Sequence, residues 1–136
     1  MMNPGMYSSM TPHWATPEGI YKELDDEFHF TFDPCPLNAD FDGLSVSWKG
    51  TVFVNPPYGR KIGNWIRKGW EESKLGWTIV MLLPARTDTR WWHDYVMKGE
   101  IRFIKGRLKF GGSKNSAPFP SCVVVFRTGW EPEKRE

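Results

Sequence analysis

The chain has 136 residues, of which 40% are hydrophobic and 25% are charged, and its formal net charge is +2. Such values are ordinary for a globular domain, and the small positive charge only weakly favours a polyanionic partner. No apolar run approaches the length of a membrane span, and the two cysteines have neither metal-site spacing nor a disulfide pattern. We expect one domain over residues 1–136 with flexible tails at 1–13 and 127–136, a cytoplasmic location, and no membrane or metal partner.

The first expected helix begins at Thr16-Pro17-Glu18. This tripeptide offers a hydroxyl for the N-cap, a proline in the first turn and an acid near the positive end of the helix. Apolar residues follow at spacings of four, at Ile20, Leu24 and Phe28. We predict that the Thr16 hydroxyl caps this helix, and a cap of this kind can also bind an anion.

Alternating phenylalanines predict a strand from Phe28 to Phe32, which Asp33-Pro34-Cys35 ends. Open α/β sheets bind ligands at the carboxyl ends of their strands, so Asp33 is a candidate ligand-binding carboxylate. The alternative is a turn that the Asp33 side chain closes before the proline. Residues 36–50 contain no Gly-x-Gly and no convincing helix. Their polar side chains either contact a ligand or belong to a solvated acidic loop: Asn38, Asp40 and Asp42.

A short buried strand at residues 51–54 runs into the corner Asn55-Pro56-Pro57-Tyr58-Gly59. Two successive prolines end the strand, because each lacks an N–H and fixes its own φ. The Asn55 side-chain oxygen and the Pro56 carbonyl could accept both hydrogens of an exocyclic amine on a nucleobase, while the Tyr58 ring stacks on the base. The alternative is a proline-rich turn in which Tyr58 packs as a lid.

An amphipathic helix that Gly76 ends is expected next, with core-facing residues at Ile62, Trp65, Ile66, Gly69 and Trp70. The apolar run at 77–83 then predicts a strand that is buried on both faces. A strand, a helix and a second strand in this order indicate a right-handed crossover with parallel strands.

The segment 84–89 should leave that second strand at the same edge of the sheet as the Pro-Pro corner. We expect Thr87 or Asp88 to cap a helix that carries Trp91, Trp92, Tyr95 and Val96. Arg86 either contacts a DNA phosphate or the pocket, or forms an ion pair with Asp88 or Asp33.

Two further strands are expected at 101–104 and 121–126, joined by a flexible loop over 111–120. Basic side chains gather around this loop, at Lys105, Arg107, Lys109 and Lys114. Basic residues beside small ones suit contacts with phosphates, because small residues let backbone amides approach. The alternative is an ordinary solvated hairpin.

The corner Asn55-Pro56-Pro57-Tyr58 resembles the Asn/Asp-Pro-Pro-Tyr motif of the amino-methyltransferases, which use S-adenosylmethionine. Within that group the chain looks most similar to the small phage-type, Dam-like DNA N6-adenine methyltransferases. The resemblance spans most of residues 14–126 and includes Trp14-Ala15-Thr16-Pro17, Phe32-Asp33-Pro34-Cys35, the segment 83–89 and the segment 106–110. It implies an α/β fold with a reduced Rossmann-like class I methyltransferase sheet, mostly parallel with an antiparallel C-terminal strand.

The same resemblance implies methyl transfer from S-adenosylmethionine to adenine N6 in double-stranded DNA, with base flipping and without a metal. A phage-encoded enzyme of this kind would act in the bacterial host cytoplasm, in a setting such as restriction-modification. Catalysis is expected at Asn55, Pro56, Pro57 and Tyr58. Cofactor binding is expected at Trp14, Thr16, Pro17, Asp33, Pro34, Cys35 and Asn55, and DNA binding at Arg86, Arg107, Lys109 and Lys114.

Other functions stay open at this point. The same motif methylates cytosine N4 in DNA, adenine in RNA and a glutamine side chain in protein, since each target is a planar amine. A further alternative is a non-enzymatic DNA-binding protein with a decayed cofactor pocket. The missing Gly-x-Gly favours that alternative, and the intact corner motif opposes it.

Overall fold

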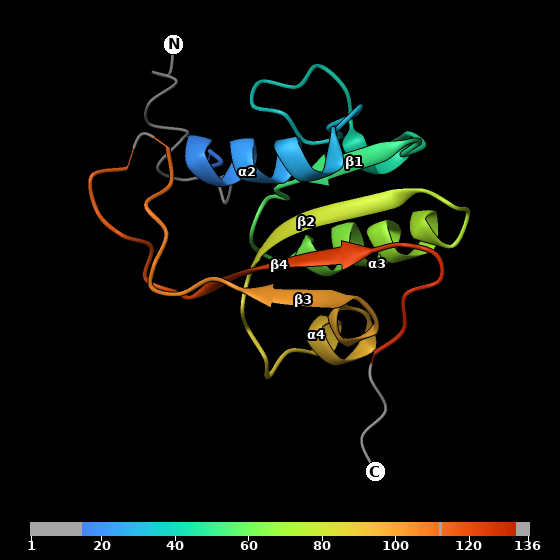
Figure 1. Ribbon diagram of the computed structural model, residues 1–136. Coiled ribbons are helices and arrows are strands. Elements are labelled where there is room, and N and C mark those ends of the chain that lie inside the picture. Colours follow the sequence, from blue (N-terminus) through green and yellow to red (C-terminus); the bar gives the residue numbers. More distant parts are fainter. Residues whose placement is uncertain (1–14, 112, 133–136) are drawn as a thin grey trace.

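A computed structural model describes residues 15–111 and 113–132 of the chain. Its centre is a four-stranded sheet in the order β1-β2-β4-β3. The strands are β1 (Thr51–Val54), β2 (Thr78–Pro84), β3 (Glu100–Phe103) and β4 (Ser121–Phe126). β1 and β2 are parallel, while β4 is antiparallel to both of its neighbours. Three strands therefore run in one direction and the last strand of the chain runs between two of them in the other (Figure 1). The expected α/β class and the antiparallel C-terminal strand are present.

Helices pack on both faces of this sheet. The Tyr21 ring of α2 (Glu18–Phe28) meets the Phe53 ring of β1 edge-to-face, with centroids 5.1 Å apart. On the other face, α3 (Ile62–Ser73) approaches β2 so closely that a Cβ on Gly69 would lie 2.8 Å from the Met81 Sδ. A side chain at position 69 would therefore displace the Met81 side chain. Ile62, Trp65 and Ile66 of the same helix are buried as the helical pattern predicted. The crossover from β1 through α3 to the parallel strand β2 is confirmed.

Shorter helices complete the second face. The 3₁₀ helix η1 (Gly43–Ser45) precedes β1, and α4 (Arg90–Asp94) and the 3₁₀ helix η2 (Val96–Lys98) lie between β2 and β3. Thr89 caps α4, because its hydroxyl accepts the Trp92 N–H at 3.3 Å. The prediction of a cap at Thr87 or Asp88 was therefore wrong. Thr89 is the residue whose extended backbone (φ −87°, ψ 156°) allows its side chain to reach the first turn.

The predicted strand over Phe28–Phe32 is not present as a strand. α2 continues through Phe28, and His29 follows in the left-handed conformation with φ 57°. Only Phe32 pairs with β1, through a single parallel bridge to Val52. The alternating rings pack together, because the centroid of the Phe30 ring lies 5.2 Å from that of Phe53 and 6.0 Å from that of Phe28. The segment nevertheless lies beside β1, so Asp33 and Asn55 follow adjacent segments at the same end of the sheet.

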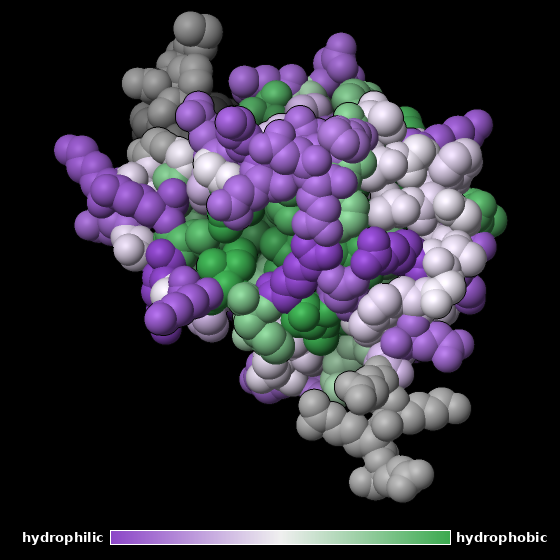
Figure 2. Space-filling view, in the orientation of Figure 1, coloured by the Kyte–Doolittle hydropathy of each residue, from purple (hydrophilic) through white to green (hydrophobic). Residues whose placement is uncertain are grey.

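A network of four charged side chains connects α2 to β3, the edge strand furthest from β1. Arg102 of β3 donates to both carboxylate oxygens of Glu27 at 2.7 and 2.8 Å and to Glu100 at 2.6 Å. Arg127 donates to the other Glu100 oxygen at 2.6 Å. Figure 2 shows hydrophilic side chains lying across an apolar area near the middle of the face in view. The network therefore joins α2 to β3 and to the residue that follows β4.

β1, β2 and β3 run in the same direction, so the loops that follow them all begin at the same end of the sheet, on the left in Figure 1. The loop after β3 also reaches the segment before α2, because Gly111 and Ala15 form an antiparallel bridge. The residues predicted to be functional are concentrated in these loops. Among the described residues no helix is long and apolar enough to cross a membrane.

Candidate functional site: two pockets on either side of a Pro-Pro corner

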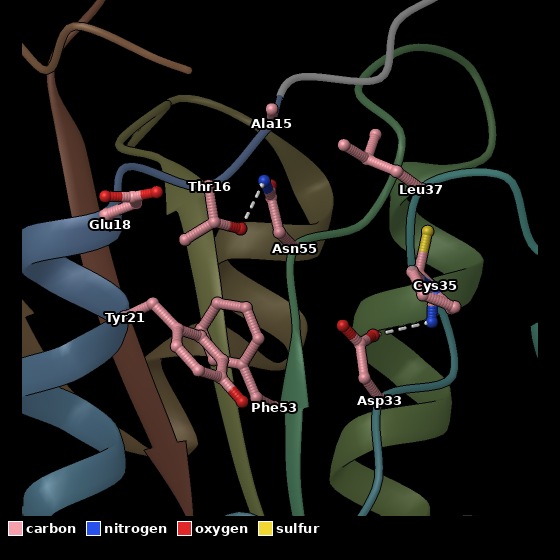
Figure 3. A pocket seen from close by; sticks show the side chains of 10 residues that line it. Ala15, Thr16, Glu18, Tyr21, Asp33, Cys35, Leu37, Phe53 and Asn55 are labelled. Atoms are coloured by element: carbon pink, nitrogen blue, oxygen red, sulfur yellow. Dashed lines mark hydrogen bonds between the residues drawn. The ribbon is translucent and has the colours of Figure 1, made fainter.

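A cavity of about 350 Å³ opens where β1 ends, and we call it the Asn55 pocket. Three segments line it: the start of α2, residues 33–37 and the end of β1 (Figure 3). The lining residues are Ala15, Thr16, Glu18, Tyr21, Asp33, Cys35, Pro36, Leu37, Phe53 and Asn55. Four of the residues predicted to bind a cofactor therefore meet in one cavity: Thr16, Asp33, Cys35 and Asn55. Pro17 and Pro34 do not line the cavity, and Trp14 lies outside the described residues.

Asn55 is held in place from the start of α2. Its side chain is 3% exposed, and its Nδ2 donates to the Thr16 Oγ1 at 3.1 Å. The N-cap of α2 is Pro17, and this helix has no side-chain cap. The prediction that Thr16 caps the helix was therefore wrong, because its hydroxyl accepts the Asn55 amide instead. This bond fixes the orientation of the Asn55 amide.

Asp33 forms the turn that was the alternative to a ligand role. Its Oδ1 accepts the Cys35 N–H at 2.8 Å, and the second oxygen points toward the cavity (Figure 3). Burial raises the pKa of the Asp33 carboxyl, and the bond from Cys35 partly offsets this. The turn uses one oxygen only, so a ligand role for the other stays a prediction.

The Cys35 thiol lies beside this carboxylate in the pocket wall. Burial and the nearby Asp33 charge raise its pKa to about 12. A thiol with such a pKa is protonated at neutral pH, and the thiolate is the reactive form of cysteine. Cys35 therefore contributes a neutral surface to the pocket and no nucleophile.

Tyr58 lies on the other side of the Pro-Pro corner and is only 6% exposed. Its hydroxyl donates to the Leu82 carbonyl at 3.3 Å, and its ring meets Phe110 and Phe119 in T-shaped contacts at 6.3 and 5.6 Å. Burial raises the pKa of this phenol. In this conformation Tyr58 packs as the lid that was the alternative to a stacking role, so stacking would require rearrangement around the ring.

A second cavity, of about 330 Å³, opens beside Tyr58, and we call it the Trp91 pocket. Its lining residues are Tyr58, Gly59, Arg60, Ile62, Pro84, Arg86, Thr89 and Trp91. Among the described residues its lining has two arginines and no acid, whereas the described lining of the Asn55 pocket has two acids and no basic residue. The Asn55-Pro56-Pro57-Tyr58 corner thus runs from one pocket to the other.

Arg86 occupies the rim of the Trp91 pocket. Among the described residues it forms no ion pair with Asp88 or Asp33, which was the alternative to a ligand contact. Its guanidinium carbon lies 6.0 Å from the centre of the Phe119 ring. The arginine is exposed, so its charge is accessible from solvent.

The basic segment after β3 lies at the same edge of the sheet. Arg107, Lys109 and Lys114 are exposed, and none of them forms an ion pair within residues 15–111 and 113–132. The Gly111 N–H donates to the Ala15 carbonyl at 2.9 Å, which brings this segment to the rim of the Asn55 pocket. The structure therefore brings the predicted DNA-binding residues to the side that carries both pockets.

Sequence reasoning missed several lining residues. Glu18 was considered only as a helix-start signal, Leu37 as part of a loop, and Tyr21 and Phe53 had no assigned role. Arg60 and Trp91 of the second pocket were missed as well. Tyr21 lies about one turn after the start of α2. This spacing is the only local sign in the sequence that Tyr21 faces the same side as Thr16.

The family model described as DNA N-6-adenine-methyltransferase (Dam) matches residues 6–134, which is nearly the whole chain. No curated protein matches, and no solved structure matches.

Proposed function

Because the chain belongs to the DNA N-6-adenine-methyltransferase (Dam) family, we propose that it transfers a methyl group from S-adenosylmethionine to adenine N6 in double-stranded DNA. The observation that carries this proposal is the placement of the Asn55-Pro56-Pro57-Tyr58 corner between two pockets of opposite charge. A transfer reaction needs two ligands that meet at one catalytic group. The corner has one end in each pocket, and we propose that the two ligands meet there.

The Asn55 pocket is the proposed cofactor site. S-adenosylmethionine carries a positive sulfonium, and the two carboxylates of the pocket, Glu18 and Asp33, favour a cation. We assign the second Asp33 oxygen to the ribose or amino groups of the cofactor, and Thr16 and Cys35 to its surroundings. The volume of about 350 Å³ lies within the range of small-molecule sites. A formed pocket without a Gly-x-Gly argues against the decayed-pocket alternative.

When bound, the cofactor supplies an electrophilic methyl group. We propose that the Asn55 side-chain oxygen and the Pro56 carbonyl accept the two N6 hydrogens of the target adenine. These bonds hold the amine in line with the methyl group and increase the electron density on its nitrogen. As the bond from N6 to the methyl carbon forms, the bond from that carbon to the donor sulfur would break, S-adenosylhomocysteine would leave with the electron pair, and N6 would release one proton to solvent. The bond from Asn55 to Thr16 positions the amide for this task.

The Trp91 pocket is the proposed site of the DNA strand beside the target. Its arginines, Arg60 and Arg86, suit backbone phosphates, and Trp91 offers a ring face for a base. Arg107, Lys109 and Lys114 extend the basic surface along the same edge. The target adenine must leave the duplex to reach Asn55. We propose that Tyr58 then stacks on it after its contacts with Leu82 and Phe119 open.

The experiment is a mass-spectrometric analysis of nucleosides from DNA that has been incubated with the protein and S-adenosylmethionine. We expect N6-methyladenine as the new product. The appearance of N4-methylcytosine alone would redirect the proposal to another amine. Loss of methylation in DNA that contains no adenine provides the control.

A further inference from the structure

Within the described residues, the lining of the Asn55 pocket carries charge of one sign only. Its carboxylates are Glu18 and Asp33, and no lysine, arginine or histidine of residues 15–111 and 113–132 lines it. A partly enclosed site of this kind attracts cations and repels phosphate groups. The electrostatics therefore favour a ligand with positive charge over a nucleotide that carries phosphates.

The two carboxylates stand on opposite sides of Asn55 (Figure 3). Glu18 lies with Thr16 at the start of α2, whereas Asp33 lies with Cys35 and Leu37 in the segment that follows Phe32. Pro36 and Leu37 line the Asp33 side, and Leu37 is 55% exposed. A flat, partly apolar group bound there would cover an otherwise exposed leucine. The Glu18 side offers the Thr16 hydroxyl, the Glu18 carboxylate and the Tyr21 ring.

We propose that Glu18 binds the ammonium group of the amino-acid end of the methyl donor and so fixes the direction in which the donor lies. This inference rests on the proposed function, since it takes S-adenosylmethionine as the ligand. The nucleoside end then occupies the Asp33 and Leu37 side, and the reactive sulfonium centre lies between the two, beside Asn55. The ligand carboxylate, which shares a carbon with the ammonium, then faces the first turn of α2, which no side chain caps.

The test compares three ligands that differ in the charged groups they carry. S-adenosylmethionine and S-adenosylhomocysteine both carry the ammonium, whereas only the first carries a sulfonium. 5′-Methylthioadenosine lacks the amino-acid end altogether. Dissociation constants for all three are measured by calorimetry with the wild type, Glu18→Gln and Glu23→Gln. Glu23 is the matched control, because it is exposed on the same helix and does not line the pocket.

For Glu18→Gln we expect about three- to tenfold weaker binding of both ligands that carry the ammonium, the modest effect of an ion pair at an exposed position. Binding of 5′-methylthioadenosine should stay unchanged, and Glu23→Gln should bind all three ligands like the wild type. A melting temperature close to that of the wild type confirms that the variant is folded.

Other outcomes overturn the assignment. Weaker binding of S-adenosylmethionine alone would place Glu18 at the sulfonium, and equal weakening of all three ligands would place it at the nucleoside. Unchanged binding of all three would remove Glu18 from the site. If the wild type bound none of the ligands, the proposed cofactor itself would be wrong, so the two failures are distinguishable.

Discussion

The side chains of Thr16 and Asn55, 39 residues apart in the sequence, meet in a hydrogen bond of 3.1 Å at the mouth of a pocket. Thr16 precedes α2, and Asn55 follows β1. The bond therefore couples the entry of the first described helix to the end of a central strand. It also holds the orientation of the amide that we assign to the target amine.

Replacing Thr16 with Val should slow methyl transfer by about tenfold, which corresponds to roughly 1.4 kcal/mol in the barrier. Valine keeps the shape of the side chain but removes the acceptor for the Asn55 Nδ2. Steady-state kinetics should show the loss in kcat more than in KM for DNA, because Thr16 acts through Asn55. Thr16→Ser retains the hydroxyl and is the control. Equal activity of the Val and Ser variants would mean that the bond does not position the amide.

Tyr58→Phe should lower the free energy of unfolding by about 0.5–1.5 kcal/mol, because it removes the hydroxyl that donates to Leu82. Tyr58→Ala should cost about 3–5 kcal/mol, since it empties a buried aromatic site. If Tyr58 also stacks on a flipped adenine, the Phe variant keeps most of its activity. The activity lost by the Ala variant should then shrink on DNA whose target adenine is mismatched. Denaturant unfolding and kinetics on paired and mismatched duplexes measure both effects. An identical loss on both duplexes would leave Tyr58 with a packing role alone.

Replacing Arg107, Lys109 and Lys114 together with Ala should weaken DNA binding for every sequence. The negative slope of log K against log salt should become shallower by up to about 3, since each phosphate contact contributes about 0.9 to its magnitude. The matched control replaces Lys49, Lys74 and Lys98, three exposed lysines that precede β1, β2 and β3 at the opposite edge of the sheet. Fluorescence anisotropy at several salt concentrations gives both slopes. Similar slopes for the two triple variants would contradict a phosphate-binding role of the segment after β3.

Arg102→Met should lower the melting temperature at neutral pH by breaking the network that joins α2 to β3. The bonds from Arg102 lower the pKa of Glu27, and bonds from Arg102 and Arg127 lower that of Glu100 despite its burial. Carboxylates with lowered pKa values stabilise the fold above their unfolded pKa of about 4.3, and this stability is lost as the pH falls. The difference in melting temperature between wild type and variant should therefore shrink below about pH 4.

Arg67→Met is the control, because the Arg67–Glu71 pair is exposed and should contribute little. A difference independent of pH would assign the effect to packing on the Phe28 ring, which lies 5.3 Å from the guanidinium.

Local patterns correctly predicted the elements in which apolar residues follow a single pattern, either the helical spacing or a continuous apolar run. The spacing of Ile62, Trp65 and Ile66 predicted α3, and the apolar runs predicted β2 and β4. The same approach failed where two periods overlap. Phe28 fits both the helical spacing and the alternation of the phenylalanines. It ends α2, and its ring stacks on Phe30, which in turn packs against Phe53.

The sequence predicted the motif residues of the site, but it did not predict most of the other residues that line the pocket. Asp33, Thr16 and Asn55 were expected to converge, and they do. Thr16 was expected to cap a helix, because a cap is a local interaction and its actual partner follows 39 residues later. Glu18, Tyr21 and Leu37 line the pocket only because three separate segments meet there, which no single window of sequence indicates.

Methyl transfer by variants of Asn55 tests the central claim most directly. The assay follows transfer of a labelled methyl group from S-adenosylmethionine to DNA and identifies the methylated nucleoside, for wild type, Asn55→Ala and Asn55→Asp. We predict N6-methyladenine with the wild type and a loss on the order of 10²–10³ in rate for Asn55→Ala, by analogy with the removal of one oxyanion-hole donor. Asn55→Asp should retain measurable activity, because a carboxylate oxygen can still accept from the amine. Affinity for S-adenosylmethionine should change little in both variants. Wild-type rates in Asn55→Ala would contradict the account, since the amine would then need no acceptor from the corner.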